Sequence, residues 1–481
     1  MTLGATDVTN LANAEGPQSE TDDDATSKPK RKKSTGGRRD ISLFGLPEVR
    51  LEMPNLQHEA AGTARIGFEE SRKLGYKRGG AVCITVARIK YKVPEEDGSI
   101  FTTPLPKEMM PRSLCAPSMM AKILVDKFAD GLPFFRQEQR FLREGLPVDR
   151  CMMSRMSEEL GMGLGCIVVA ARDEAMKTAF CLATDATGVA IQPTRLEEKT
   201  RQQCRKGHFF VTLADRDHVF FSFEPAHTSK AVCALFAGYT GYVQADASAV
   251  YDALFRGEAL HDDGLSEFAP PKEVGCWAHA RRKFYEAAIT TKDPRAKEAL
   301  LRIRMLFEKE AAWQKLAPDK RGELRKAVFT TWLDDFFAWA ELCYHDVKNA
   351  RGPLAAAFGY AIRQRAPLCR FIENGKLRID NNPSENALRP VALGRKAWLF
   401  FGSDDHAEAA ANLMGLIASC KLHAIEPMAY LEAVIRAVPY WPKDRFVELA
   451  PKYWIATRAR LDPAELDAPL GPITVPSPLP K

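Results

Sequence analysis

Several features that would place this chain in other protein classes are missing. No run of about 18 apolar residues occurs, which argues against a membrane-spanning helix. The polar, acidic N-terminus does not look like a secretion signal. The eleven cysteines are scattered without a CxxC pair, so neither a zinc finger nor a disulfide framework is expected. Cys276 and His279 form a single CxxH half-site. Together these absences predict an intracellular protein.

Length, composition and charge limit the possible architectures. A chain of 481 residues is too long for one ordinary domain, and its hydrophobic fraction of 46% is ample for two or three packed cores. The net charge of +6 is compatible with nucleic-acid binding without arguing for it. Residues 1–40 are predicted to be a disordered tail, acidic and then basic, with seven Lys or Arg between Lys28 and Arg39. This tail would be a DNA-attracting arm or a solubilising segment.

Residues 41–165 change from a strand pattern to a helical one. Residues 41–110 are predicted to form a small strand-containing region, with a strand from Val82 to Val93. Residues 111–165 are predicted to be helical, with breaks at 131–133 and 145–147. Such short helices allow a helix-turn-helix arrangement with recognition helix 149–160, in which Arg150 and Arg155 contact DNA. A plain three-helix bundle is the alternative.

The centre of the chain has the pattern of a mixed sheet. Three strands come first, and a short hairpin link joins the second of them to the third. A helix, a strand, a helix and a strand follow. The predicted strands are 178–193, 207–215, 218–225, 241–246 and 273–279. This is the order of a ribonuclease-H-like α/β fold, predicted over 175–420 with a large helical insertion at 280–375. Residues 421–462 are predicted to be helical and the Pro-rich 463–481 to be loose.

The segment IDNNPSENALRPVALGRKAWLFFGS, Ile379 to Ser403, combines a carboxylate with a basic and aromatic run. Asn382 is predicted to be the N-cap of a helix that carries Glu385 in its first turn. A metal-binding carboxylate beside phosphate-binding cations and a ring suits an enzyme that cuts nucleic acid backbones. The candidate DNA contacts are Arg389, Arg395, Lys396 and Trp398. The alternative is a capping-box Glu385 that pairs with Arg389 at i+4.

Two further carboxylates fit the chemistry of two-metal phosphoryl transfer. The predicted fold places Asp185 inside the first strand and Asp246 at the carboxyl end of the fourth strand, so both would meet Glu385. Hard oxygen ligands of this kind select Mg²⁺ or Mn²⁺, and two ions are expected. As alternatives, Asp185 is a turn residue and Asp246 a helix cap. His279, predicted at the end of the fifth strand, would orient water or a phosphate, or simply be packed.

The Ile379–Ser403 segment resembles the C-terminal signature of the IS66-type insertion-sequence transposases. The matching residues are Asp380, Asn381, Asn382, Glu385, Arg389, Pro390, Gly394, Arg395, Lys396, Leu399 and Phe400. The resemblance covers roughly 39–439 and departs from the family at Ala186 and Asn386. A Cys-rich segment common near the N-terminus of the family is also not seen.

This resemblance implies a DDE transposase with the catalytic and metal-binding triad Asp185, Asp246 and Glu385. It would cleave transposon ends and transfer strands into target DNA. Double-stranded DNA, other copies of the chain and accessory proteins of the same element would be its partners, in the bacterial cytoplasm at the nucleoid. The alternatives are a ribonuclease-H-like nuclease without joining activity and a decayed transposase that only binds DNA. A glycosidase with paired carboxylates fits poorly, because the basic and aromatic surroundings suit phosphate better than sugar.

Overall fold

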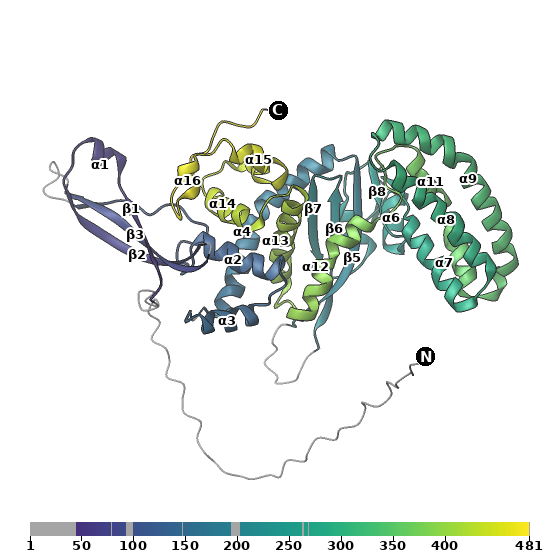
Figure 1. The fold of residues 1–481 in the computed structure, drawn as a ribbon, viewed down its shortest axis with the longest axis horizontal. Coiled ribbons are helices and arrows are strands. Elements are labelled where there is room, and N and C mark those ends of the chain that lie inside the picture. The colour runs from purple at the N-terminus through teal and green to yellow at the C-terminus, as the bar shows by residue number, and fades with distance from the viewer. Residues whose placement is uncertain are drawn as a thin grey trace, which may run out of the picture. The chain divides into compact units, whose positions relative to one another are not determined.

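The computed structural model describes residues 45–77, 79–92, 100–146, 148–193, 203–261, 264–267 and 269–480. The predicted tail, 1–40, lies outside the described residues. The fold is mixed α/β, as predicted, and its elements are shown in Figure 1. In the described part of the chain, no helix is both long enough and apolar enough to cross a bilayer.

The first sheet is built around one central strand. Strand β3 (Gly80–Lys92) pairs in parallel with β1 (Glu48–Met53) and antiparallel with β2 (Arg65–Lys77) and β4 (Ile100–Thr102). The strand predicted at 82–93 is thereby confirmed. Tyr91 is fully buried, and its hydroxyl donates to Glu59 in α1 (Leu56–Ala60).

Three helices follow: α2 (Pro117–Phe128), α3 (Phe134–Arg143) and α4 (Arg150–Thr178). Both predicted breaks are confirmed, at Gly131 and Gly145, which have the positive φ angles that glycine tolerates. The predicted recognition helix 149–160 is wrong in length, because α4 continues to Thr178. Its small residues allow close packing on α13 (Asp404–Leu422). A Cβ at Gly161 would lie 2.4 Å from the carbonyl oxygen of Ala409.

The central sheet has the order β11-β8-β5-β6-β7. Its strands are β5 (Cys181–Ile191), β6 (Arg205–Ala214), β7 (His218–Glu224), β8 (Tyr242–Gln244) and β11 (Lys272–Val274). Strands β5, β6 and β7 are antiparallel neighbours, whereas β8 and β11 run parallel to β5. The predicted succession of strands is therefore confirmed.

Short elements connect these strands. They are α5 (Ser229–Leu235), η2 (Ala249–Tyr251), α6 (Asp252–Arg256) and a hairpin of β9 (Glu258–His261) and β10 (Gly264–Glu267). The sequence did not predict this hairpin. The fifth strand was predicted to reach residue 279, but β11 ends at Val274 and a helix begins at Trp277.

A helical block follows the sheet, as predicted, and has its own core. It comprises α7 (Trp277–Thr291), α8 (Pro294–Trp313), α9 (Pro318–Val347), η3 (Lys348–Ala350), α10 (Pro353–Arg363), α11 (Arg365–Cys369) and η4 (Arg370–Ile372). Proline at the first position starts α8, α9 and α10, where its missing N–H costs no hydrogen bond. Trp277 is fully buried in this core, and its indole N–H donates to the Leu368 carbonyl at 2.8 Å.

The chain then returns to the central sheet. Helix α12 (Asn382–Trp398) lies against β5 and β6, and α4 and α13 pack against β7 (Figure 1). The remaining elements are α14 (Pro427–Ala437), η5 (Lys443–Leu449), α15 (Pro451–Arg458) and α16 (Pro463–Asp467).

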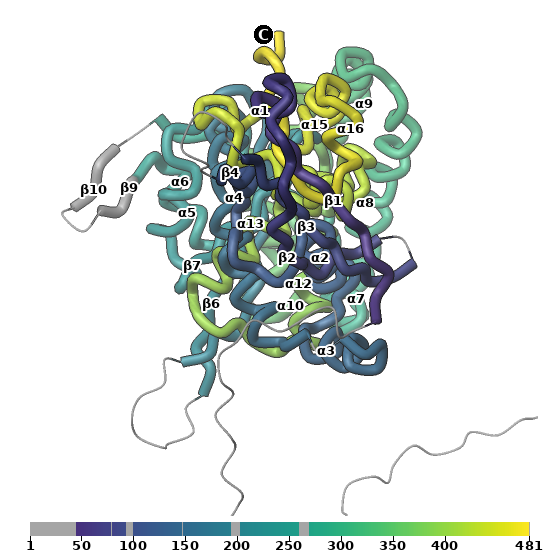
Figure 2. Tube along the Cα trace, turned by 90° about the vertical axis from the view of Figure 1, so that its left-hand side faces the viewer, coloured from purple at the N-terminus to yellow at the C-terminus, as the bar shows by residue number. Residues whose placement is uncertain are grey.

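The Pro-rich end of the chain is docked, so the prediction that 463–481 is loose is wrong for the part described. Leu470 and Ile473 are each 3% exposed, and Leu470 packs with Ile84 and Val86 of β3. Apolar side chains between the prolines supply the burial that composition alone did not reveal. Figure 2 shows the first strands, in purple, beside the last helices, in yellow.

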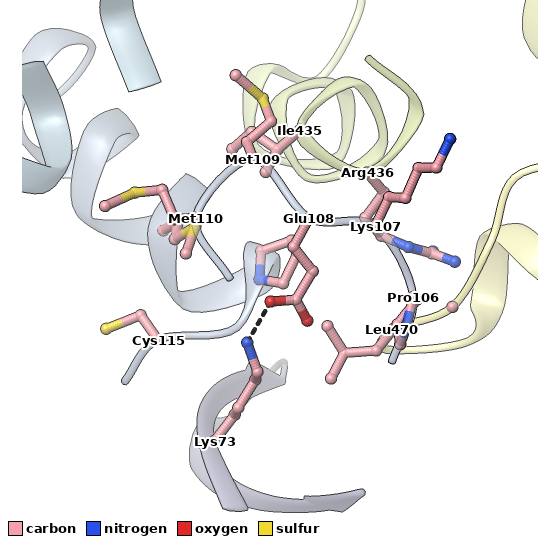
Figure 3. A pocket seen from close by; sticks show the side chains of 13 residues that line it. Lys73, Pro106, Lys107, Glu108, Met109, Met110, Cys115, Ile435, Arg436 and Leu470 are labelled. Carbon is pink, nitrogen blue, oxygen red and sulfur yellow. Dashed lines mark hydrogen bonds and ion pairs between the residues drawn. The ribbon is translucent and has the colours of Figure 1, made fainter. Parts of the chain in front are cut away.

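A buried ion pair lies close to this junction (Figure 3). Lys73 on β2 is 4% exposed, and its Nζ lies 2.5 Å from Oε2 of Glu108. The pair lines a small cavity of about 20 Å³, which has room for about one water molecule.

Replacing one partner of this pair is expected to destabilise the protein strongly. In Lys73→Met the Glu108 carboxylate, whose side chain is 14% exposed, loses its partner, and breaking such a mostly buried pair typically costs about 3–5 kcal/mol of unfolding free energy. Urea unfolding followed by circular dichroism measures the change. The matched control is Lys320→Met, which removes an exposed partner of Glu323 and should cost less than about 1 kcal/mol. Equal losses in the two variants would contradict the prediction.

Candidate active site

The pairing of β5 with β8 brings two aspartates together. The parallel register aligns Ala183 with Gln244. The same offset of 61 residues, carried two residues further, aligns Asp185 with Asp246 just after β8 ends. Asp246 therefore follows the end of β8 near the level of Asp185 on β5, and its negative charge acts on Asp185.

The start of α12 is fastened to β5 next to Asp185. The N-cap is Asn381, not Asn382 as predicted, because the helix begins one residue earlier. The Asn381 side chain is fully buried and does not cap its own helix. Its amide instead donates to the Thr184 carbonyl at 2.7 Å. This contact places Glu385, one turn into α12, beside the residue that follows Thr184.

A second set of hydrogen bonds holds the segment that leads into α12. The buried side-chain amide of Gln244 donates to the Arg378 carbonyl at 3.0 Å. The backbone N–H of Trp277 donates to the Ile379 carbonyl at 2.8 Å. The backbone N–H of Asn381 donates to the Cys276 sulfur at 3.3 Å. Cys276 of the CxxH half-site therefore supports the helix start. The sequence pattern gave no sign of these positioning roles of Gln244 and Asn381.

The three candidate carboxylates act on one another electrostatically. The pKa of Asp185 is raised from 3.8 to about 6. Burial is the largest cause, the Ala186 N–H opposes it, and the negative charges of Asp246 and Glu385 add to it. The structure therefore brings the predicted triad into one electrostatic neighbourhood.

Glu385 lies against two basic side chains of α7. Its Oε1 is 3.8 Å from His279 Nε2, and its Oε2 is 3.4 Å from Arg282 Nη2. No ion pair with Arg389 occurs among the described residues, so the i+4 pairing alternative is not what the structure shows. His279 stands in the first turn of α7, not at a strand end as predicted. Burial lowers its pKa, and Glu385 opposes that effect.

The chemistry of Asp185, Asp246 and Glu385 is suited to binding divalent cations. Three carboxylates are hard oxygen donors of the kind Mg²⁺ and Mn²⁺ prefer. Oε1 of Glu385 is buried without a hydrogen-bond partner, and the pKa of Asp185 is raised first by burial and then by the charges of Asp246 and Glu385. In this conformation no three Asp, Glu, His or Cys side chains of the described residues are close enough to ligate one ion. The three carboxylates are close enough to influence one another's charge but too far apart to ligate one ion together.

The basic and aromatic run on α12 divides into two kinds of residue. Arg389 and Lys396 are exposed. Arg395 is exposed but donates to the Gly188 carbonyl at 2.9 Å, which ties α12 to β5. The Trp398 ring folds back over Gly394, where a Cβ would lie 1.8 Å from the ring, and contacts Phe401. Trp398 therefore packs within the protein.

The two predicted DNA contacts on α4 lie away from these carboxylates in sequence. Arg150 and Arg155 are both exposed near the start of the helix. Arg150 lies 3.7 Å from Glu138 and stands over the ring of Phe135, whereas no ion pair to Arg155 occurs within the described part of the chain.

Comparison with known protein families covers most of the chain. A family model described as "Transposase IS66 family" matches residues 112–409, and a second, "IS66 C-terminal element", matches residues 415–451. The chain belongs to the IS66 family of transposases. All three candidate carboxylates and the whole helical block lie within the first match.

Three proteins from Sinorhizobium fredii (strain NBRC 101917 / NGR234) are similar in sequence to this chain. "Uncharacterized protein y4qI" is 27% identical over 408 residues, covering 83% of this chain and 74% of the relative. "Uncharacterized protein y4hP" is 28% identical over 383 residues, covering 74% of this chain and 65% of the relative. "Uncharacterized protein y4jD" is 25% identical over 361 residues, covering 73% and 68%. Part of each relative thus lies outside the match.

Proposed function

We propose that this protein is a DDE transposase that cleaves DNA at transposon ends and joins the exposed 3′ hydroxyl to target DNA. The observation that carries the proposal is the electrostatic influence of Asp246 and Glu385 on Asp185, three carboxylates that come from the end of β8, α12 and β5. The strand order, three antiparallel strands followed by two parallel ones, supports a ribonuclease-H-like catalytic core. Family membership makes DNA the expected substrate.

The proposal gives each residue a role. Asp185, Asp246 and Glu385 would hold two Mg²⁺ or Mn²⁺ ions. When bound, such ions activate the attacking oxygen and stabilise the leaving oxygen. His279 orients the attacking water from the first turn of α7, and Arg282 balances the charge of Glu385. Arg395 and Trp398 hold α12 in place.

Binding of the DNA backbone falls to the exposed cations. Arg389 and Lys396 would contact phosphates beside the triad, and Arg150 and Arg155 would contact the duplex from α4 in a helix-turn-helix-like region. Two transposon ends must be held together, so a homo-oligomer on DNA is expected, with accessory proteins of the same element.

A strand-transfer assay tests this proposal. Purified protein, Mn²⁺ or Mg²⁺ and labelled DNA ends of the element are incubated with a target plasmid. Joined product is expected with the wild type and none with Glu385→Gln. Glu286→Gln, which neutralises an exposed glutamate of the neighbouring α7, is the control and should join normally.

Two other outcomes point to the alternatives. Cleavage without joining would indicate a ribonuclease-H-like nuclease. DNA binding without cleavage in any variant would indicate a decayed transposase that only binds DNA. Ala186 and Asn386, which differ from the usual family residues, would then be the first positions to examine. Restored cleavage in Asn386→Arg would then identify the cause.

A further inference from the structure

A large cleft adjoins the candidate triad. It holds about 820 Å³ between the central sheet and helices α8 and α9 of the helical block. Its lining includes Ala183, Gln244 and Pro383. Each stands two residues before one member of the triad. Because side chains at i and i+2 of a strand share a face, Asp185 faces the same side as Ala183. The cleft wall therefore comes within two residues of each candidate carboxylate along the chain, and Asp380 of the segment before α12 is part of it.

The acidic groups in this cleft are already neutralised or hydrogen-bonded. Asp215 accepts hydrogen bonds from the N–H groups of Phe180 and Cys181. Glu310 forms an ion pair with the buried Arg325, and Asp217 one with Lys452. Asp380 accepts from the N–H of Asn382. Two of the four carboxylates are thus balanced by a cation, and among the residues described only Asp215 and Asp380 line the cleft without an ion pair.

The basic groups in the cleft are not neutralised in the same way. Arg216, Lys315, Lys376 and Arg378 line it and are exposed, and no ion pair to them occurs in the part of the chain that the structure describes. Arg321 lies among them and donates to the Gly375 carbonyl at 2.8 Å. Burial lowers the pKa of Arg321, and the positive charges of Arg325, Arg216 and Arg378 lower it further. Mutual repulsion of this kind is relieved by a bound anion.

Aromatic rings also border the cleft. Phe180 stands beside Lys376, whose Nζ lies 5.4 Å from the ring centre, and Phe307 lines the wall formed by α8. Cations that follow a phosphate backbone together with rings on which bases stack are the usual means of holding unpaired nucleic acid. A volume of about 820 Å³ is of the size that encloses one drug-sized ligand, comparable to a few nucleotides and far below a turn of duplex.

We propose that this cleft, between β5, β8 and helices α8 and α9, holds a few unpaired nucleotides of a DNA strand that passes over the carboxylate triad. Arg216 and Arg378 bind its phosphates, and Phe307 stacks on a base. The inference rests on the proposed function for the identification of the ligand as DNA. It assigns to the helical block a part in separating or guiding the strand at the cleavage point.

The test uses the full chain carrying Glu385→Gln, in EDTA, so that neither metal nor cleavage is involved. Fluorescence anisotropy measures binding of a labelled eight-nucleotide oligo-dT and of a labelled duplex. The double variant Arg216→Ala/Arg378→Ala should weaken oligo-dT binding about tenfold or more. It should also reduce the slope of log K against log salt by about 1.4, for two lost phosphate contacts. The control Arg304→Ala, on α8 outside the cleft lining, should change binding less than twofold.

A second variant separates stacking from charge. Phe307→Leu keeps an apolar side chain in the wall and should weaken oligo-dT binding about tenfold while duplex binding is unchanged, since stacked bases of a duplex are not available to the ring. Unchanged oligo-dT binding in the double variant, or equal losses for oligo-dT and duplex, would overturn the inference. The strand-transfer assay is independent of these measurements, so failure of the proposed activity and failure of the cleft are distinguishable.

Discussion

Asp185→Asn is expected to abolish DNA cleavage and, at the same time, to stabilise the metal-free protein at pH 7. Loss of a metal-binding carboxylate removes several kcal/mol of transition-state stabilisation, and each 1.36 kcal/mol is tenfold, so cleavage should fall by at least about 10³-fold. The stability change has a separate cause. Asp185 is largely buried, with the negative charges of Asp246 and Glu385 nearby, and an uncharged amide of the same shape removes both the cost of burying its charge and that repulsion.

The sign of the stability change follows from the pKa. The pKa of Asp185 rises from 3.8 to about 6 on folding, so the folded state holds its proton more tightly than the unfolded state. The contribution of Asp185 to stability is therefore fully present below pH 3.8 and is lost as pH rises through about 6. A shift of this size corresponds to an upper limit of about 3 kcal/mol, and on the order of 1–3 kcal/mol is expected.

Thermal unfolding in EDTA measures this effect across pH. The unfolding temperature of Asp185→Asn should exceed that of the wild type at pH 7, and the difference should shrink toward zero near pH 4. Asp252→Asn, in the first turn of α6, is a control outside the triad that should show no such gain. A wild type more stable than Asp185→Asn at pH 7 without metal would mean that Asp185 has a structural partner instead.

Local sequence patterns predicted most of the elements around the site. Short apolar runs separated by turn residues identified β5, β6 and β7, and Gly131 and Gly145 identified the helix breaks. The positions of Asp185 and Asp246 followed from strand order alone, because a parallel pair aligns residues by a constant offset. Helix α12 was displaced by only one residue.

Features that depend on long-range contacts could not be predicted in this way. The length of α4 depends on its packing against α13, which lies more than two hundred residues later in the chain. His279 was expected on a strand because Trp277 continues the apolar pattern of β11, but that ring belongs to the core of the helical block. The link from Asn381 to Thr184 joins residues 197 apart, and a capping motif gives no sign of it.

Replacement of Asn381 is expected to have the second-largest effect on activity. In Asn381→Ala the Thr184 carbonyl loses its donor, and α12 loses its attachment to β5 at the point that positions Glu385. A displacement of about 1 Å of a catalytic group can reduce rate about 10²-fold, and a buried group left without its partner costs about 1–3 kcal/mol of stability. Both the cleavage rate and the unfolding free energy should therefore fall.

The neighbouring Asn382 provides the matched control. It belongs to the same sequence motif but is exposed, so Asn382→Ala should retain cleavage within a few-fold of the wild type. Titration with Mn²⁺ distinguishes a misplaced Glu385 from general unfolding. In Asn381→Ala, high Mn²⁺ should partly restore cleavage, because the three carboxylates are still present. In Asp185→Asn, high Mn²⁺ should restore none. If Asn382→Ala proved as damaging as Asn381→Ala, the buried hydrogen bond to Thr184 would not be what places Glu385 at the site, and the attachment through Gln244 and Arg378 would have to carry that role.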